Sequence, residues 1–354
     1  MRNFFLRITA VLMTFVCFLG SLCACGVQKN EYTSFAMGSV ITATLCGSDK
    51  DRIDVLWDEI SSDIAKTDGF LSATAAGSDI SRINTTGSAV VDGYTVSFLQ
   101  KAVLLCNTLN RSLDISVGAV TQLWGFTEGT PSVPDENELK NAVQTVGIDS
   151  VFIDEANKTV SVAAGQKLDV GALGKGEACD IMKKKLIDAD IPSCISFGGN
   201  ILVTGKNPSG KNGEWKIGMR DPLGGENDVF ATLTLSAENG ALCVSTSGSY
   251  EKQFKENGKK YHHIIDPDTG YPVENGLVSV SVICESGLNA DALSTALFVN
   301  GLDDTAVLWL KSFNADAVFV FEDGTVYITD GISKNFAIIK SDYYKIASYE
   351  ESAK

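Results

Sequence analysis

The pattern of apolar positions predicts a chain that mixes helices and strands. Apolar residues recur every three or four positions over 53–64 and over 96–109, which is the spacing of one helix face. Alternating or short continuous apolar runs predict strands at 32–45, 193–204, 215–219, 229–235, 242–245, 277–283 and 317–329, and a hairpin around Asn157-Lys158 over 151–162. Because helices and strands do not alternate regularly, the predicted class is α+β with mixed or antiparallel sheets.

The stretch after residue 260 combines both histidines of the chain with a predicted turn. His262 and His263 are the two histidines among 354 residues. They lead into Asp266-Pro267-Asp268-Thr269-Gly270, where proline presets φ and glycine allows the chain to reverse. A histidine pair in this setting is either structural or catalytic.

A helix is predicted over 288–299, with Asn289 as its N-cap. Asp291 and Thr295 are four positions apart, so their oxygen atoms project from one helix face. Two oxygen ligands one helical turn apart suit a hard cation such as Mg²⁺. An aspartate near a helix start is also explained by the helix dipole alone, so both interpretations stand.

A glycine-rich segment, Leu168-Asp169-Val170-Gly171-Ala172-Leu173-Gly174-Lys175-Gly176, precedes a helix predicted over 177–186. Unpaired amides at a helix N-terminus favour phosphate, and Lys175 adds a positive charge there. The segment matches neither G-x-G-x-x-G nor G-x-x-x-x-G-K-[ST], so it is neither a Rossmann fingerprint nor a P-loop. A purely structural helix start is the alternative.

Composition limits the kinds of partner and the number of domains. The formal net charge of −15 argues against nucleic acid, because phosphate contacts need Lys and Arg. No linker or repeat divides the chain, so one elaborated domain is predicted for 31–345, with a tail at 346–354. Six cysteines without a C-x-x-C pair are interpreted as small buried hydrophobes, with a disulfide left open: Cys46, Cys106, Cys179, Cys194, Cys243 and Cys284.

Residues 1–24 have the form of a lipoprotein signal peptide. A basic start and a short apolar run are followed by Leu22-Cys23-Ala24-Cys25, in which small residues flank the last cysteine. We predict that Cys25 carries lipid, that residues 25–30 form a short tether, and that the protein is anchored at the extracytoplasmic face of the cell membrane. An ordinary cleaved signal peptide with an unmodified Cys25 is the alternative.

Eight short segments form an ordered series along the chain. They are MGS at 37–39, SDISRIN at 78–84, DISVG at 114–118 with LWGF at 123–126, DVGALGKG at 169–176, FGGN at 197–200, SGSY at 247–250, HIIDPDTG at 263–270 and ADALSTA at 290–296. Taken together they resemble the ApbE family, the FAD:protein FMN transferases. The resemblance implies a single α+β domain related to the T-fold, with a cofactor cleft between its lobes.

The resemblance also implies which residues form the site. FAD would be contacted by Met37, Thr74, Ser112, Leu113, Asp114, Asp169, Lys175 and Ile265. Mg²⁺ or Mn²⁺ would be held by the Ala172 carbonyl, Asp291 and Thr295, and His263, titrating near neutrality, would assist catalysis. Two positions depart from the family pattern, since Thr74 stands where many members have an aromatic residue and Lys175 where some have Glu.

The implied reaction moves the FMN half of FAD onto a Ser or Thr hydroxyl of an acceptor protein, through a phosphoester bond, and releases AMP. The implied acceptors bear a Ser/Thr flavinylation motif, as subunits of membrane redox complexes do. Two other functions stay open: a divalent-dependent FAD pyrophosphatase giving FMN and AMP, and a flavin-binding lipoprotein without turnover. Residues 291–296 themselves resemble an acceptor motif, but the metal interpretation already uses Asp291 and Thr295.

Overall fold

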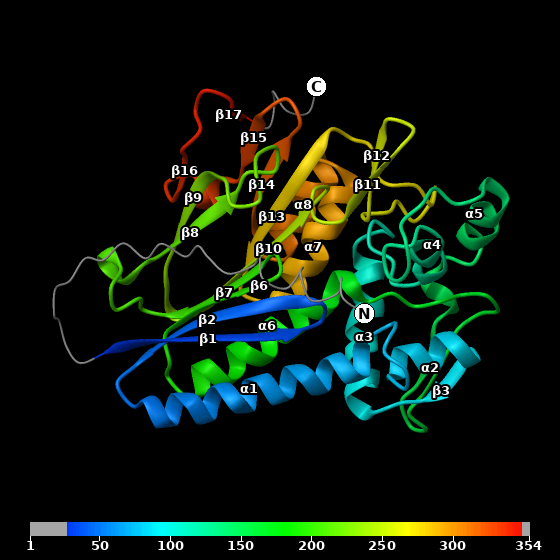
Figure 1. Cartoon of the computed structure of the whole chain (residues 1–354), viewed down its shortest axis with the longest axis horizontal. Helices are drawn as coiled ribbons and strands as arrows, with labels where there is room; N and C mark the ends of the chain where they lie inside the picture. The colour runs from blue at the N-terminus through cyan, green and yellow to red at the C-terminus, as the bar shows by residue number, and fades with distance from the viewer. Residues whose placement is uncertain (1–26, 349–354) are drawn as a thin grey trace, which may run out of the picture.

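A nine-stranded sheet is the centre of the computed structural model, which describes residues 27–348 (Figure 1). Its order is β1-β2-β6-β7-β10-β13-β14-β15-β17, and all neighbours are antiparallel except the parallel pair β15–β17. The strands are β1 (Gln28–Ala36), β2 (Ser39–Gly47), β6 (Ser193–Phe197), β7 (Asn200–Gly205), β10 (Ala237–Gly248), β13 (Leu277–Cys284), β14 (Asp316–Phe321), β15 (Thr325–Ile328) and β17 (Lys345–Ala347).

Helices and three smaller sheets surround this sheet, which confirms the α+β class. The helices are α1 (Lys50–Leu71), α2 (Asp79–Thr86), α3 (Gly93–Thr108), α4 (Gly118–Leu123), α5 (Glu136–Val143), α6 (Gly171–Asp188), α7 (Gly287–Asn300) and α8 (Asp304–Ser312). The smaller sheets are β16 (Phe336–Ile338), β9 (Val229–Leu235) and β8 (Trp215–Arg220); β3 (Ser88–Val90), β5 (Thr159–Ser161) and β4 (Phe152–Asp154); and the hairpin β11 (Gln253–Glu256) and β12 (Lys259–His262).

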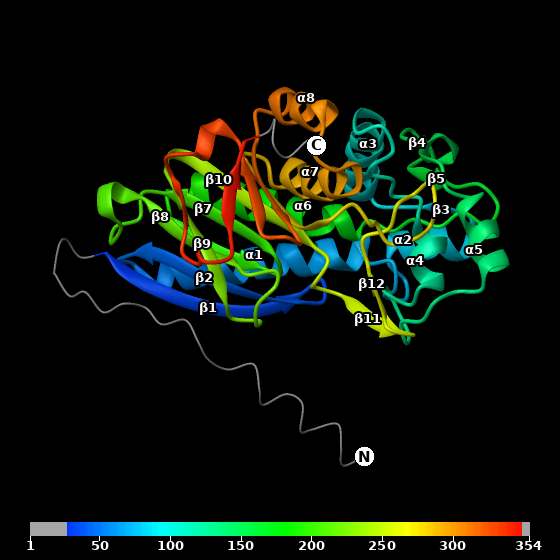
Figure 2. The same ribbon diagram turned by 90° about the horizontal axis from the view of Figure 1, so that it is seen from above.

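Two apolar cores lie on opposite faces of the large sheet. On one face, α1, α6 and α7 bury residues such as Ile60, Leu173 and Leu293 against the strands. On the other face, the β16-β9-β8 sheet buries Phe230 and its neighbours. Figure 2 shows the same arrangement from above, with the helices layered beside the strands. Burial of both strand faces explains why the central strands read as nearly continuous apolar runs.

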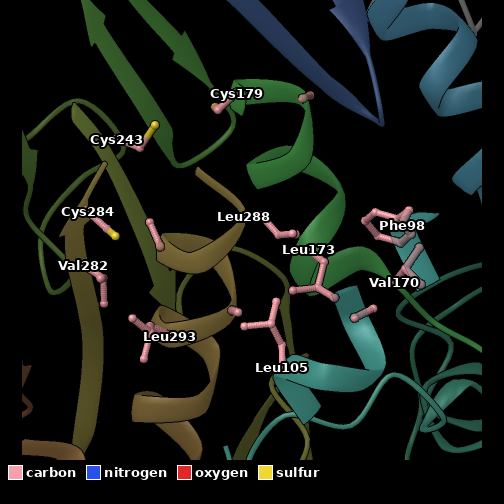
Figure 3. Packing of buried hydrophobic residues seen from close by; sticks show 14 of the residues in the cluster. Phe98, Leu105, Val170, Leu173, Cys179, Cys243, Val282, Cys284, Leu288 and Leu293 are labelled. Carbon is pink, nitrogen blue, oxygen red and sulfur yellow. The ribbon is translucent and has the colours of Figure 1, made fainter. Parts of the chain in front are cut away.

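The six cysteines behave as the small hydrophobes predicted from their apolar surroundings. All six are free, and all but the half-buried Cys194 are buried. Cys179, Cys243 and Cys284 lie among apolar side chains close to α6, α7 and the central strands (Figure 3). Burial raises the pKa of Cys46, Cys194 and the other buried thiols above their ordinary value, which suppresses the reactive thiolate form.

Several boundaries predicted from the sequence are wrong. The runs at 193–204 and 317–329 are not single strands but the hairpins β6–β7 and β14–β15, because glycines with positive φ reverse the chain between them. The motif at 114–118 lies outside the strands; its one sheet-like contact is an isolated bridge from Val117 to Lys167. Local apolar content identified these segments as extended chain but did not identify the turns.

The starts of both site helices also differ from the prediction. Helix α6 begins at Gly171 rather than at residue 177, so Gly174 and Gly176 lie inside the helix and not before it. The N-cap of α7 is Ser286, whose side chain accepts a hydrogen bond from the Asn289 amide. Asn289 is therefore inside the helix, three residues after the serine that caps it, and this serine lies two residues beyond the end of β13.

The chain ends extend the strands further than predicted. Strand β1 begins at Gln28, so residues 28–30 are strand rather than tether, and Asn30 is buried with its amide donating to the Leu45 carbonyl. Strand β17 continues to Ala347, into the predicted tail. The predicted signal peptide and Cys25 lie outside the described residues. Between residues 27 and 348, no helix combines the length and apolar character needed to cross a membrane.

Helices α6 and α7 approach each other backbone to backbone through two glycines. A Cβ placed on Gly176 would lie 2.4 Å from the Gly287 carbonyl oxygen, and a Cβ on Gly287 would lie 2.5 Å from the Gly176 carbonyl oxygen. Any side chain at either position must therefore push the helices apart. The two glycines allow side chains of α7 to reach the backbone of α6.

We predict that Gly176→Ala lowers the free energy of unfolding by about 1–3 kcal/mol, because the added methyl group overpacks this contact. Gly69→Ala is the matched control, since Gly69 lies in α1 with nothing within 4 Å of a Cβ. The control should gain up to about 1 kcal/mol from better helix propensity. Urea unfolding of both variants measures the difference, and equal stability of the two would show that the helices separate at no cost.

Candidate active site

A cavity of about 730 Å³ opens where α1, α6 and α7 meet the loop that follows β12. Every site residue predicted from the sequence lines it: Met37, Thr74, Ser112, Leu113, Asp114, Asp169, Ala172, Lys175, His263, Ile265, Asp291 and Thr295. These residues come from segments spread along most of the chain. The fold therefore brings the predicted set together around one space large enough for a nucleotide-sized ligand.

The Asp291 carboxylate is held by a hydrogen bond to each oxygen. The Gly176 amide donates to Oδ2 at 2.8 Å, and Ser245 Oγ lies 2.7 Å from Oδ1. Asp291 is only 5% exposed and sits one helical turn before Thr295, whose hydroxyl lies 3.1 Å from Ser247 Oγ. The donors are neutral, so they orient the carboxylate without cancelling its charge.

Asn200 continues this network one residue further. Ser245 Oγ also lies 2.7 Å from Asn200 Oδ1, while the buried Asn200 Nδ2 has no partner. A single hydroxyl proton serves one acceptor at a time. Turning the Asn200 amide by half a rotation lets its nitrogen donate to Ser245 Oγ, which then donates to Asp291. In this orientation each of the two hydrogen bonds has its own proton, so we assign it; the Asn200 oxygen then occupies the position that has no protein partner.

The oxygen donors around Asp291 fit a hard cation. Ala172 lies in the first turn of α6, and Asp291 and Thr295 face it from α7. Within residues 27–348, no three His, Cys, Asp or Glu side chains gather into a metal site. A carboxylate, a hydroxyl and a carbonyl make an incomplete shell that suits Mg²⁺, which usually completes its octahedron with water and substrate phosphate.

Two further aspartates line the cavity. Asp114 is buried, and its Oδ1 accepts from the backbone amide and hydroxyl of Ser116 at 2.8 and 2.6 Å. Its Oδ2 is buried without a partner. Asp169 accepts from the Thr121 hydroxyl and the Gly171 amide at 2.8 and 2.9 Å. Asp114 Oδ2 thus has unused capacity to accept a ligand N–H or O–H.

The turn between β1 and β2 is fixed against α1. Met37 adopts a φ of 47°, and its amide donates to Asp68 Oδ2 at 2.9 Å. Lys175 extends from α6 toward the same region, with its Cδ 3.5 Å from a Cβ placed on Gly198. Among residues 27–348, no carboxylate forms an ion pair with Lys175. Its charge is therefore available to an anionic ligand.

The remaining predicted contacts lie on loops at the rim and wall of the cavity. Thr74 is exposed in the loop after α1, where its amide donates to Ser72 Oγ. Ser112 and Leu113 follow α3, and Ile265 is bridged to Pro272 across the turn predicted from the sequence. Thr74 offers no ring for stacking at this position.

His263 directly follows β12 and is neutral in the folded protein. Its amide donates to the Lys252 carbonyl at 3.1 Å, and its ring meets Phe126 edge-on. Burial, reinforced by the nearby charge of Lys252, lowers the pKa of His263 to about 3. The expectation that this group titrates near neutrality is therefore wrong. Its buried Nδ1 has no hydrogen-bond partner.

Aromatic side chains pack against the loop that follows β12 and carries His263, called the histidine loop below. Trp124 Nε1 donates to the Gly270 carbonyl at 2.7 Å, which ties the turn to α4. Trp124 also contacts Phe126, Phe254 and Tyr261, so the β11–β12 hairpin rests on the same cluster. Buried aromatic contacts of this kind give the loop a rigid base.

Carboxylates outnumber cations around the cavity. The carboxylates are Asp68, Asp114, Asp169, Asp291 and Glu251, and the cations are Lys175 and Lys252. An anionic ligand would meet net repulsion there in the absence of a metal ion. The charge balance therefore agrees with the oxygen donor set in favouring a bound cation.

Sequence reasoning missed the groups that orient Asp291. The sequence places Ser245 only at the end of a predicted strand and Asn200 only in a glycine-rich motif, and it predicts that the Gly176 amide faces a phosphate. A signal was present, because a serine and an asparagine are unusual at fully buried strand positions. Their common partner is visible only once β7, β10 and α7 are side by side.

Comparison with known proteins identifies similar chains and folds. The sequence model of the protein family described as "ApbE family" matches residues 37–319 of this chain. A "FAD:protein FMN transferase" of Treponema pallidum is 30% identical over 350 residues, covering 93% of this chain and 95% of that protein. A crystal structure of the ApbE protein of Thermotoga maritima is 31% identical with a TM-score of 0.79, covering 87% of this chain and 99% of that one. The apo flavinyl transferase ApbE of Pseudomonas stutzeri shares the fold at 23% identity, with a TM-score of 0.75 over 89% of this chain and 98% of that one.

The depressed pKa of His263 predicts a loss of stability in acid. The unfolded histidine takes up a proton below pH about 6.5, whereas the folded one stays neutral until pH about 3. The free energy of unfolding therefore falls as pH drops through this window, by up to about 2 kcal/mol between pH 7 and 5.

The variant His263→Gln lacks this contribution, so its stability should change less than that of the wild type between the two pH values. Urea unfolding at pH 7 and pH 5 measures both differences. Other titrating groups, including the half-buried His262, are common to the two proteins. Identical pH dependence in both would contradict the burial of a neutral imidazole.

Proposed function

The chain belongs to the ApbE family, and from this premise we propose that it transfers the FMN half of FAD to an acceptor protein with the help of Mg²⁺ or Mn²⁺. The oxygen of an acceptor Ser or Thr hydroxyl attacks the phosphorus of the FMN phosphate. A new P–O ester bond forms, the bond to the bridging oxygen breaks, and AMP leaves with that oxygen. The hydroxyl proton passes to His263.

The observation that carries this proposal is the shared cavity of His263, Asp291 and Thr295. Phosphoryl transfer needs positioning and charge neutralisation more than a covalent group of the enzyme. A bound divalent ion would supply charge stabilisation on the diphosphate. Asp291, Thr295 and the Ala172 carbonyl are the residues that would hold it, and Lys175 adds a second positive charge on the same wall of the cavity.

His263 is suited to accept a proton because it is unprotonated at neutral pH. A base with a pKa of about 3 is weak in the free protein. A diphosphate bound nearby carries negative charge, which raises the pKa of a neighbouring imidazole. The substrate itself would thus strengthen the base, and Nδ1 has acceptor capacity that no protein group uses.

The adenosine end of FAD has its own candidate partner. Asp114 Oδ2 is a buried acceptor without a donor, which is costly unless a ligand supplies one. An amino group or a ribose hydroxyl of the AMP half meets that need. Asp169 is held by three donors and keeps the start of α6 in place. These two aspartates would orient the leaving half while the other end reacts.

The test is incubation with FAD, Mg²⁺ and a candidate acceptor protein, with AMP measured by chromatography and covalent FMN by mass spectrometry. FMN on a Ser or Thr of the acceptor supports the proposal. AMP with only free FMN favours the pyrophosphatase. FAD binding that survives chelation, without AMP, favours a flavin-binding lipoprotein.

Asp291→Ala should lower divalent-dependent AMP release at least about 100-fold, because it removes the sole carboxylate of the proposed cation site. FAD should still bind through the rest of the cavity. Asp268→Ala, in the exposed turn, is the control and should retain activity. Unchanged AMP release in Asp291→Ala would remove the metal assignment.

Ser245→Ala should weaken Mn²⁺ binding by about 10- to 100-fold, because the donor that orients Asp291 is lost. Loss of the free Mn²⁺ paramagnetic resonance signal measures the affinity in the presence of FAD. Ser281→Ala is the matched control, since Ser281 is a buried strand serine bonded to Thr246 instead. Equal Mn²⁺ affinity in both variants would show that Ser245 has no part in positioning Asp291.

A further inference from the structure

The β11–β12 hairpin projects from the body of the molecule beside α4 (Figures 1 and 2). It forms a separate two-stranded sheet, so β11 has one side paired with β12 and one free side. His263 is the first residue after β12. The free side of β11 therefore lies one strand away from the residue proposed to take the acceptor's proton.

The free side of β11 offers unused backbone hydrogen-bonding groups. The Lys252 carbonyl accepts from the His263 amide, which marks these two residues as a hydrogen-bonded pair. Because such pairs alternate along an antiparallel ladder, Gln253 and Lys255 direct their amides and carbonyls outward. Within residues 27–348, neither residue has a backbone partner on that side. An extended peptide could pair there as an added strand.

A groove leads from the cavity to this edge. Its volume is about 360 Å³, and its lining includes Glu128, Pro131 and Gln253. Phe126, Thr127, Glu251 and Lys252 also line the main cavity. The two spaces are therefore contiguous. A chain lying along β11 would enter the cavity at the end where His263 lies.

The hairpin carries positive charge that the rest of the molecule does not neutralise. Lys255 and Lys260 are cross-strand partners and both are exposed. Like charges placed directly opposite each other destabilise a sheet. Among residues 27–348, no carboxylate pairs with Lys252, Lys255 or Lys260, although the chain as a whole carries −15. A bound anionic group would offset this cost.

Lysines on an edge strand also discourage sheets from pairing with each other. That role needs only scattered charges. It requires neither a facing pair of lysines nor a groove continuous with the cavity. The combination of free edge, groove and paired lysines is better explained by a ligand that is both extended and acidic.

Resting on the proposed transfer reaction, we propose that the free edge of β11 docks the extended segment of the acceptor that carries the reacting Ser or Thr. Lys255 and Lys260 hold acidic side chains of that segment. Lys255 is three positions after Lys252, which lines the cavity, and this distance is about 10 Å in a strand. Acidic residues about three positions from the reacting hydroxyl fit this spacing.

The experiment uses two fluorescent synthetic peptides of twelve residues, each with one central Thr. One peptide has Asp three positions before and after the Thr, and the other has Lys at both places. Fluorescence anisotropy with the whole protein measures binding. The wild type should bind the acidic peptide about fivefold or more tightly than the lysine peptide at low salt, through the Asp that lies beside the facing pair Lys255 and Lys260 and through the added strand.

The double variant Lys255→Glu/Lys260→Glu should lose this preference. Lys216→Glu/Lys334→Glu is the matched control, because it changes net charge equally at exposed lysines near β8 and β16. Gln253→Pro removes the outward amide without breaking the ladder and should weaken binding, whereas Gln253→Ala keeps the amide and should not.

The proposal is overturned if the wild type binds the two peptides equally or binds neither of them. An equal loss in the Lys216/Lys334 control assigns the effect to bulk charge, and a weaker FAD affinity in the Lys255/Lys260 variant assigns these lysines to FAD. Either result also overturns it. AMP release from FAD, measured without peptide in the same samples, reports separately on the proposed reaction.

Discussion

The contact between Gly176 and Gly287 is the constraint on which the candidate site depends. Without side chains at these positions, the backbones of α6 and α7 come close enough for Asp291 to accept from the Gly176 amide. Ala172 of α6 and Thr295 of α7 line the same cavity. A cation site built from a carbonyl, a carboxylate and a hydroxyl needs this spacing, because oxygen ligands of Mg²⁺ must lie within a narrow distance range.

The negative charge of the cavity depends on how its aspartates are held. Asp291 is fixed by neutral donors and keeps its negative charge, and the neighbouring aspartates add to it. Under the proposed function, a diphosphate would enter such a cavity together with a cation, so substrate binding and metal binding would be coupled. His263 is neutral for a different reason, since burial makes the charged imidazole costly. On this proposal, the free protein would gain a cation and an anion together.

An aromatic cluster around Trp124 supports the part of the cavity that the histidine loop forms. Trp124 ties the turn at Gly270 to α4, and Phe254 and Tyr261 rest on the same ring. The hairpin and the histidine loop are therefore one unit. Its inner face positions His263, and its outer edge leaves Gln253 and Lys255 unpaired. One packed cluster can in this way serve both the reacting atoms and a docking partner.

The sequence alone determined the α+β class, four of the eight α-helices between residues 27 and 348, and the Asp291–Thr295 pair, because helical spacing is a local property of neighbouring residues. The resemblance to a known family implied further residues that line the cavity, such as Asp114, Lys175 and His263. Only the tertiary structure decided that Ser245 and Gly176, far away along the chain, orient Asp291, and that His263 is neutral. Hydrogen-bond partners from distant segments and the loss of water around a side chain arise only when the chain is folded, so no local pattern encodes them.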